Sequence, residues 1–230
     1  MKGQTEHRRM RGFTLVEMAV VMLIVSLLLG GLLLPLSNRV EQERRSVAQE
    51  AMEQAMEALV GYALSTGRLP CPDVDNDGLE DLSGCQQVDS AFNAGTLPWA
   101  TLNIQGGDPW DQNRSFGYAV NGAFVSTTTP FTLSTVGTGS GILQVYDGVS
   151  GGCSGAGQVA VNVPAILYSN AKNDYGVTAG SSDEQENADN DNCFISRGYS
   201  TAAGSEFDDL VGWLSPNILF NRMVAAGRLP

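Results

Sequence analysis

The feature that most constrains this chain is a 24-residue apolar run near its N-terminus that holds a single charge. The run extends from Phe13 to Leu36, and its one charged residue is Glu17. A helix of that length crosses a hydrocarbon core of about 30 Å, because it rises about 1.5 Å per residue. A carboxylate inside such a span costs several kcal/mol unless it finds a partner. The sequence therefore predicts a transmembrane segment over residues 13–36 and marks Glu17 as a functional residue.

The segment before the run is a short basic leader. Residues 1–12 contain four basic residues and one acid and end in Gly12. Because positive flanks stay in the cytoplasm, we expect the chain to cross a membrane once, with the leader in the cytoplasm and the rest of the chain exported. A secretory signal peptide would be cut after its apolar region at small residues, which Leu32–Leu36 does not offer. Two alternatives stay open at this point: an ordinary signal anchor, and a Glu17 that snorkels from the lipid interface.

The junction between leader and run carries a recognisable motif. The segment RGFTLVE at residues 11–17 resembles the processing site of type IV prepilins and type II secretion pseudopilins. The resemblance implies that prepilin peptidase cuts after Gly12, removes residues 1–12 and N-methylates Phe13. It also implies that Glu17 pairs with the N-terminal amine of a neighbouring subunit during filament assembly. Pro35 departs from the pattern, since it lies one residue later than the helix-kinking proline of these families.

The residues after the run have a helical pattern. No glycine or proline occurs between Leu36 and Gly61. Apolar residues recur there at the spacing of a helix face. One stripe comprises Val47, Ala51, Ala55 and Ala58, and another comprises Ala48, Met52, Leu59 and Ala63. We expect one long helix from about Phe13 to Ser65, with a soluble half over 37–67, stopped by Gly67 and Pro70. A signal anchor followed by a stalk is the alternative.

The remaining residues, 68–230, are numerous enough for one globular head. Short apolar runs between turn-forming residues predict strands. These are Ser115–Phe124 with a break at Asn121-Gly122, Gly141–Tyr146, Gln158–Val163, Ala165–Tyr168, Cys193–Tyr199 and Phe207–Leu214. Ser215 and Pro216 predict the start of a final helix over Asn217–Ala226. The expected fold class is α+β, a pilin-like fold in which the long N-terminal helix packs on an antiparallel β-sheet head.

Charge and cysteine content narrow the function. Residues 13–230 hold nine basic and 24 acidic residues, and such an acidic surface argues against nucleic acid as a partner. All four cysteines, Cys71, Cys85, Cys153 and Cys193, follow the apolar run. In an oxidising periplasm an even number of cysteines predicts two disulfides, for which three pairings exist. We prefer Cys71–Cys85 with Cys153–Cys193, because this pairing closes local segments.

One acidic loop has the spacing of a calcium site. The segment DVDNDGLED at residues 73–81 has acids at its first, third, fifth and ninth positions and glycine at its sixth, as in an EF-hand loop. Side-chain oxygens would come from Asp73, Asp75 and Asp77, a backbone carbonyl from Leu79, and a direct or water-mediated ligand from Asp81. Hard oxygen ligands favour Ca²⁺. Gly84 stands where a bidentate acid is expected, so another segment would have to complete the shell. A solvated acidic turn is the alternative.

Two other acidic features lack ligand spacing. Asp183–Asp191 is interpreted as a mobile surface loop, although one of its acids is the candidate to complete the shell of the first loop. Asp208-Asp209 is interpreted as a strand-edge or cap feature rather than a catalytic pair.

These observations bear on three classes of function. The favoured one is a structural subunit, a minor pilin or pseudopilin of a type IV pilus or type II secretion filament, with prepilin peptidase, other subunits and the inner membrane as partners. The second is a membrane-anchored, calcium-dependent binding module outside any filament. An enzyme is not expected, because His7, the only histidine, lies in the leader.

Overall fold

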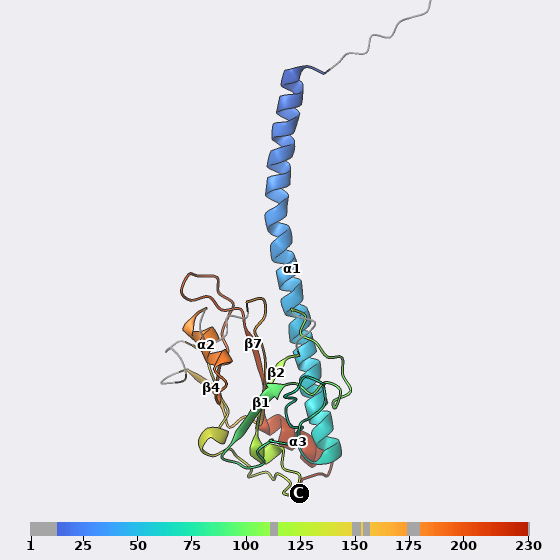
Figure 1. Ribbon diagram of the computed structural model, residues 1–230, viewed down its shortest axis with the longest axis vertical. Coiled ribbons are helices and arrows are strands. Elements are labelled where there is room, and N and C mark those ends of the chain that lie inside the picture. The colour runs from blue at the N-terminus through green and yellow to red at the C-terminus, as the bar shows by residue number, and fades with distance from the viewer. Residues whose placement is uncertain (1–12, 111–114, 149–152, 154–156, 174–179, 230) are drawn as a thin grey trace, which may run out of the picture. The chain divides into compact units, whose positions relative to one another are not determined.

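The structure is a computed structural model of the chain (Figure 1). It describes residues 13–110, 115–148, 153, 157–173 and 180–229, and the side chains of residues 31–38 lie outside the description. The chain divides into two compact units, Met1–Arg44 and Arg45–Pro230, called below the N-terminal unit and the head unit.

Helix α1 extends from Leu15 to Thr66 and so contributes residues to both units. Its end is the predicted one: Gly67 has a left-handed φ of 84°, and its N–H donates to the carbonyl of Ala63 at 2.8 Å. A glycine in this conformation commonly ends a helix because it lacks a Cβ. The long helix expected from the sequence is therefore confirmed.

The expected membrane span has a different outcome. Among the described residues, no helix combines the length and the apolarity that crossing a membrane requires. The transmembrane segment predicted over residues 13–36 is thus not confirmed by the structure. Gly12 lies outside the described residues, as does the side chain of Pro35.

The head unit is built around the C-terminal part of α1. Five α1 residues at the spacing of one helix face are buried: Ala48, Met52, Ala55, Leu59 and Ala63. They share a core with the four-stranded sheet described below and with the C-terminal helix α3, Pro216–Ala225. All four members of the second predicted stripe are buried, whereas of the first stripe Ala55 is buried, Ala51 and Ala58 are half-buried and Val47 is 47 % exposed.

The strands form two sheets. The four-stranded sheet is antiparallel in the order β1-β2-β5-β7. Its strands are β1 Phe92–Thr96, β2 Gly117–Asn121, β5 Ala165–Ser169 and β7 Leu210–Leu214. The three-stranded sheet has the order β4-β3-β6, with β4 antiparallel and β6 parallel to β3. Its strands are β3 Gln144–Tyr146, β4 Gln158–Val161 and β6 Cys193–Ile195. The α+β class is confirmed, and the parallel β3–β6 pair corrects the expectation of a purely antiparallel head.

The central strands of the four-stranded sheet, β2 and β5, are buried on both faces. Tyr118, Val120 and Leu167 belong to the core that contains α1. The alternate residues Ala119 and Ile166 belong to a second core that contains β3 and β6. Strands that are covered on both faces are apolar throughout rather than alternating, which is why the short runs of the head sequence show no clear period of two.

Three local predictions are corrected. Strand β1 was not predicted, because its sequence, FNAGT, is poor in the residues that favour strands. The last strand is present but starts at Leu210 rather than at Phe207, whereas the final helix begins at Pro216 after the N-cap Ser215, as predicted.

The third correction concerns the second acidic stretch, where the expected surface loop is wrong. Residues Ser182–Ala188 form helix α2, and Asp183 and Glu184 are buried within it. The helix starts with a capping box, in which the side chain of Ser181 and the side chain of Glu184 each accept the other residue's backbone N–H.

Candidate functional site

The first candidate site is the start of α1, where Thr14 and Glu17 form a second capping box. The Glu17 carboxylate oxygen Oε2 accepts the Thr14 backbone N–H and the Thr14 hydroxyl, both at 3.0 Å. The Glu17 N–H donates to the Thr14 hydroxyl oxygen at 3.2 Å. This reciprocal arrangement fixes the Glu17 rotamer one turn from Phe13. The sequence analysis identified Glu17 but missed Thr14, although Thr-x-x-Glu is the signature of such a box.

Around Glu17 the apolar side chains of the N-terminal unit are exposed. Phe13 is 81 % exposed and Leu15 is 88 % exposed. The same holds for the large apolar residues from Val16 to Leu29. A contiguous apolar surface of this kind marks a site of contact with a protein or membrane partner. Glu17 is the only charged residue of that segment.

The second candidate site is the acidic loop in the head unit. Asp73, Asp75 and Asp81 each offer a carboxylate oxygen, and these oxygens lie within 4.8 Å of one another. Asp77 is not in this group, and its Oδ1 accepts the Leu79 N–H at 2.7 Å. Three of the four predicted side-chain ligands therefore converge and one does not. Within the described part of the chain, no acid of Asp183–Asp191 joins the group.

The buried member of the loop, Asp73, already has hydrogen-bond partners. Its Oδ1 accepts the Asn76 N–H at 2.7 Å, and its Oδ2 accepts the Gly78 N–H at 2.8 Å. Gly78 has the left-handed φ of 86° that the sharp turn requires. A Cβ at Gly78 would also come within 2.5 Å of the Trp99 ring. The loop is thus held in shape by its own backbone and by Trp99.

A partly buried polar network anchors the same loop to the end of α1. The Arg68 guanidinium binds both oxygens of Glu80 at 2.7 Å, and the Tyr62 hydroxyl donates to Glu80 Oε1 at 2.7 Å. Burial and the hydrogen bond to Glu80 raise the pKa of Tyr62 to about 12. The Cys71 N–H also donates to Glu80. Sequence analysis missed Glu80, because its partners come from three separate positions along the chain.

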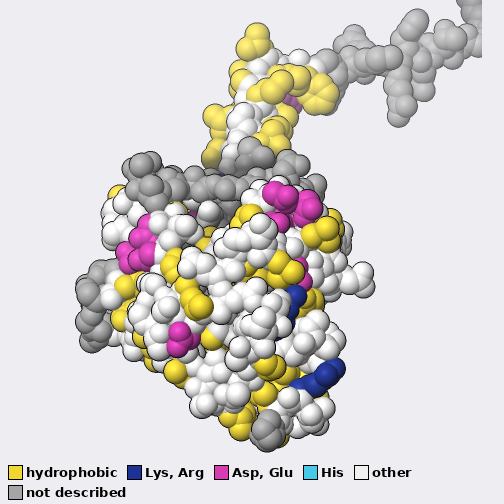
Figure 2. All heavy atoms as spheres, turned by 60° about the horizontal axis from the view of Figure 1, so that its bottom comes forward, with side chains coloured by type: hydrophobic (Ala, Val, Ile, Leu, Met, Phe, Trp, Pro, Cys, Tyr) yellow, Lys and Arg dark blue, Asp and Glu magenta, His cyan; other side chains and the backbone are white. Residues whose placement is uncertain are grey.

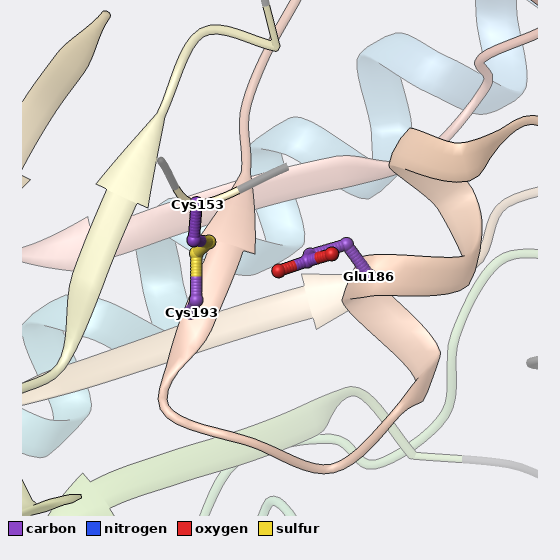
Figure 3. Close-up of side chains that lie close together, drawn as sticks. All are labelled: Cys153, Glu186 and Cys193. Atoms are coloured by element: carbon purple, nitrogen blue, oxygen red, sulfur yellow. A yellow bond between two sulfur atoms is a disulfide. The ribbon is translucent and has the colours of Figure 1, made fainter. Parts of the chain in front are cut away.

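The cysteines form the two disulfides of the preferred pairing. Cys71 is joined to Cys85 across the acidic loop, and Cys153 is joined to Cys193 at the start of β6. Figure 3 shows the Glu186 carboxylate, which comes from α2, directed toward the second disulfide. Both sulfur atoms of that pair are bonded to each other, so this group of Cys153, Glu186 and Cys193 offers no thiolate to a metal ion.

The surface of the head fits its acidic composition. On the face shown in Figure 2, acidic side chains form small separate groups and basic side chains are few. The basic side chains that this view shows are separated from one another.

Comparison with known proteins bears on the first candidate site. The family model of the prokaryotic N-terminal methylation motif matches residues 7–33. No curated protein and no solved structure shows significant similarity to the chain. The match is the type IV prepilin and pseudopilin signature, so the resemblance of residues 11–17 is confirmed. It implies a pilin-like precursor that prepilin peptidase processes and that assembles with other pilin subunits, which are usually non-enzymatic proteins.

Proposed function

We propose that this protein is a minor pilin or pseudopilin, a structural subunit of a type IV pilus or type II secretion filament. The observation that carries the proposal is the methylation motif, whose Glu17 is held by Thr14 at the start of an exposed apolar helix. Cleavage after Gly12 would free the amine of Phe13. N-methylation of Phe13 then keeps a cation at the edge of the apolar segment.

Glu17 is the residue that this cation is proposed to meet in a neighbouring subunit. Among the described residues, Thr14 is the sole donor to the Glu17 carboxylate, and both of its hydrogen bonds end on Oε2. A carboxylate paired with an ammonium group in a low-dielectric helix bundle is strongly favoured over two lone charges. The pair would therefore set the register between neighbouring helices.

Before assembly, residues 13–36 are proposed to hold the precursor in the inner membrane, with the leader in the cytoplasm and the head in the periplasm. The support comes from the sequence: 24 residues with one charge, preceded by a leader with four basic residues. The buried helix face of the head unit and its two disulfides suit an exported, globular domain.

The experiment is a processing and assembly assay on the full chain. The precursor is co-expressed with and without a prepilin peptidase and the remaining filament subunits, and sheared filaments are collected by sedimentation. Leader removal that depends on the peptidase, followed by recovery in filaments, supports the proposal. An uncut chain that stays with the membrane fraction in the presence of the peptidase would contradict it and favour a membrane-anchored module.

A second candidate function, calcium-dependent ordering of the head, rests on the convergence of Asp73, Asp75 and Asp81. The fit is partial, because the Asp73 carboxylate already accepts two backbone N–H groups. Exposed Asp75 would be the most direct ligand to Ca²⁺. If calcium binding to this loop raises the melting temperature of the head, Asp75→Asn should abolish that rise. Asp77→Asn is the matched control and should keep it. Equal responses of the two variants to calcium would identify a solvated turn.

A further inference from the structure

A third group of acids lies inside the head unit, apart from the sites above. Glu184 comes from the first turn of α2, and Asp208 and Asp209 directly precede β7. Each of these residues is at most 4 % exposed, and their carboxylate oxygens lie within 4.8 Å of one another. Three carboxylates in one buried place repel one another and have lost their hydration. Such an arrangement is unfavourable unless a positive charge nearby lowers its free energy.

Hydrogen bonds compensate the group only in part. The Glu184 carboxylate accepts the backbone N–H groups of Asp208 at 3.0 Å and Ser181 at 3.4 Å. Asn187 donates to Asp209 Oδ2, and Asn173 donates to Asp208 Oδ2, both at 2.8 Å. The other oxygen of Asp208, Oδ1, is buried and has no hydrogen-bond partner among the described residues. A buried carboxylate oxygen without a donor, inside a group of acids, indicates a ligand position.

The neighbouring arginines are directed at other groups. The Arg45 guanidinium donates to the backbone carbonyl of Asp208 at 2.9 Å and lies over the Tyr199 ring. Arg197 forms an ion pair with Asp183 and lies over the Phe207 ring. Within the described residues, neither Glu184 nor Asp208 is part of an ion pair. Burial and the charge of Glu184 raise the pKa of Asp208 to about 6, while the backbone N–H groups of Asn173 and Lys172 and the charge of Arg45 act in the opposite direction.

We propose that Glu184, Asp208 and Asp209 form an internal binding site for one hard divalent cation, Ca²⁺ in an exported protein. Carboxylate oxygens are the ligands that Ca²⁺ prefers, and backbone carbonyls or water would complete its shell of six to eight oxygens. The ion would join α2 to the segment that leads into β7, the edge strand of the four-stranded sheet. The site is independent of both the filament proposal and the acidic loop.

The test measures calcium binding to the full chain in detergent, in an Asp75→Asn background that removes the contribution of the loop. After treatment with a chelator and exchange into calcium-free buffer at pH 7.5, we expect calorimetry to find one equivalent of bound Ca²⁺ and calcium to raise the melting temperature. Adding Asp208→Asn, which keeps the shape of the side chain, should weaken binding by about tenfold or more, because it removes a charged ligand. Adding Glu186→Gln, an acid on the same helix that is outside the group, should leave binding unchanged.

Two results would overturn the proposal. One is a background protein that binds no calcium. The other is an Asp208→Asn protein that binds calcium as tightly as the background. If Asp208→Asn does not fold, as judged by near-ultraviolet circular dichroism, the stoichiometry of the background protein decides alone: one equivalent supports the site and none refutes it.

Discussion

Two helices of this protein begin with the same capping arrangement, yet the glutamates in that arrangement have opposite surroundings. At the start of α1, Thr14 and Glu17 are exposed, whereas at the start of α2, Ser181 and Glu184 are each 4 % exposed. The local sequence pattern, a hydroxyl residue three positions before a glutamate, is shared. The surroundings of the two glutamates differ. Exposed apolar side chains follow Glu17, whereas two further acids lie close to Glu184.

The comparison shows that the same local motif occurs in two opposite environments, one exposed and one buried. The exposed Glu17 carboxylate, next to an apolar surface, is available to a partner outside the chain, which we propose is the amine of another subunit. A buried carboxylate among other acids is available only to an ion that enters the head. The environment, rather than the motif, therefore determines which partner each glutamate takes.

The largest expected effect is that of replacing Glu17, compared with replacing an acid on the head. Glu17→Gln removes the charge and keeps the size of the side chain. Because the lost charge is the one proposed to pair with the Phe13 amine of a neighbouring subunit, incorporation into filaments should fall by about tenfold or more. The melting temperature of the head should stay the same. Glu53→Gln, an exposed acid on the same helix, is the control, and both variants are scored by immunoblot of sheared filaments. Equal incorporation of the two variants would remove the pairing role of Glu17.

We expect an intermediate effect from replacing Glu80, because this half-buried carboxylate is paired within the chain. Glu80→Gln should lower the free energy of unfolding of the head by about 1–3 kcal/mol, because it weakens the bonds to Arg68 and Tyr62 and leaves buried donors poorly satisfied. Chemical denaturation followed by tryptophan fluorescence measures this change. Glu57→Gln, whose contact with Arg222 is exposed and 3.5 Å long, should change the same quantity by a few tenths of a kcal/mol. A Glu80 variant as stable as the Glu57 variant would show that the network does not anchor the loop.

The smallest expected effect contrasts the two caps directly. Ser181→Ala and Thr14→Ala each remove a capping hydroxyl, which costs about 0.5–2 kcal/mol of helix stability. Only Ser181→Ala should lower the melting temperature of the head, since Thr14 lies in the N-terminal unit. Thr14→Ala should instead speed amide hydrogen exchange at Glu17, and Thr14→Ser should restore protection. A drop in head stability on Thr14→Ala would contradict the separation of the two sites.

The parts of the molecule that depend on local sequence could be predicted. The long helix and its stop at Gly67, the final helix after Ser215 and the processing motif were all read from neighbouring residues. Local closure also favoured the pairing of Cys71 with Cys85 and of Cys153 with Cys193, which the structure has.

The parts that depend on distant contacts could not be predicted in this way. The acids of α2 were expected at the surface, because acidic composition normally indicates solvent, whereas Glu184 is buried by its approach to Asp208. No local sequence pattern marked Glu80, because its partner Tyr62 lies 18 residues away. The Ser181-x-x-Glu184 signature was present in the sequence, and attention to it would have revealed helix α2.

The central claim is that the chain is matured as a pilin at Gly12 and Phe13 before it joins a filament. Mass spectrometry of the N-terminal peptide from the assembled protein tests this claim most directly. The account predicts a peptide that begins at Phe13 and carries one methyl group on its α-amine. Protein recovered with its residues 1–12 intact, or cut at any other position, would contradict the account.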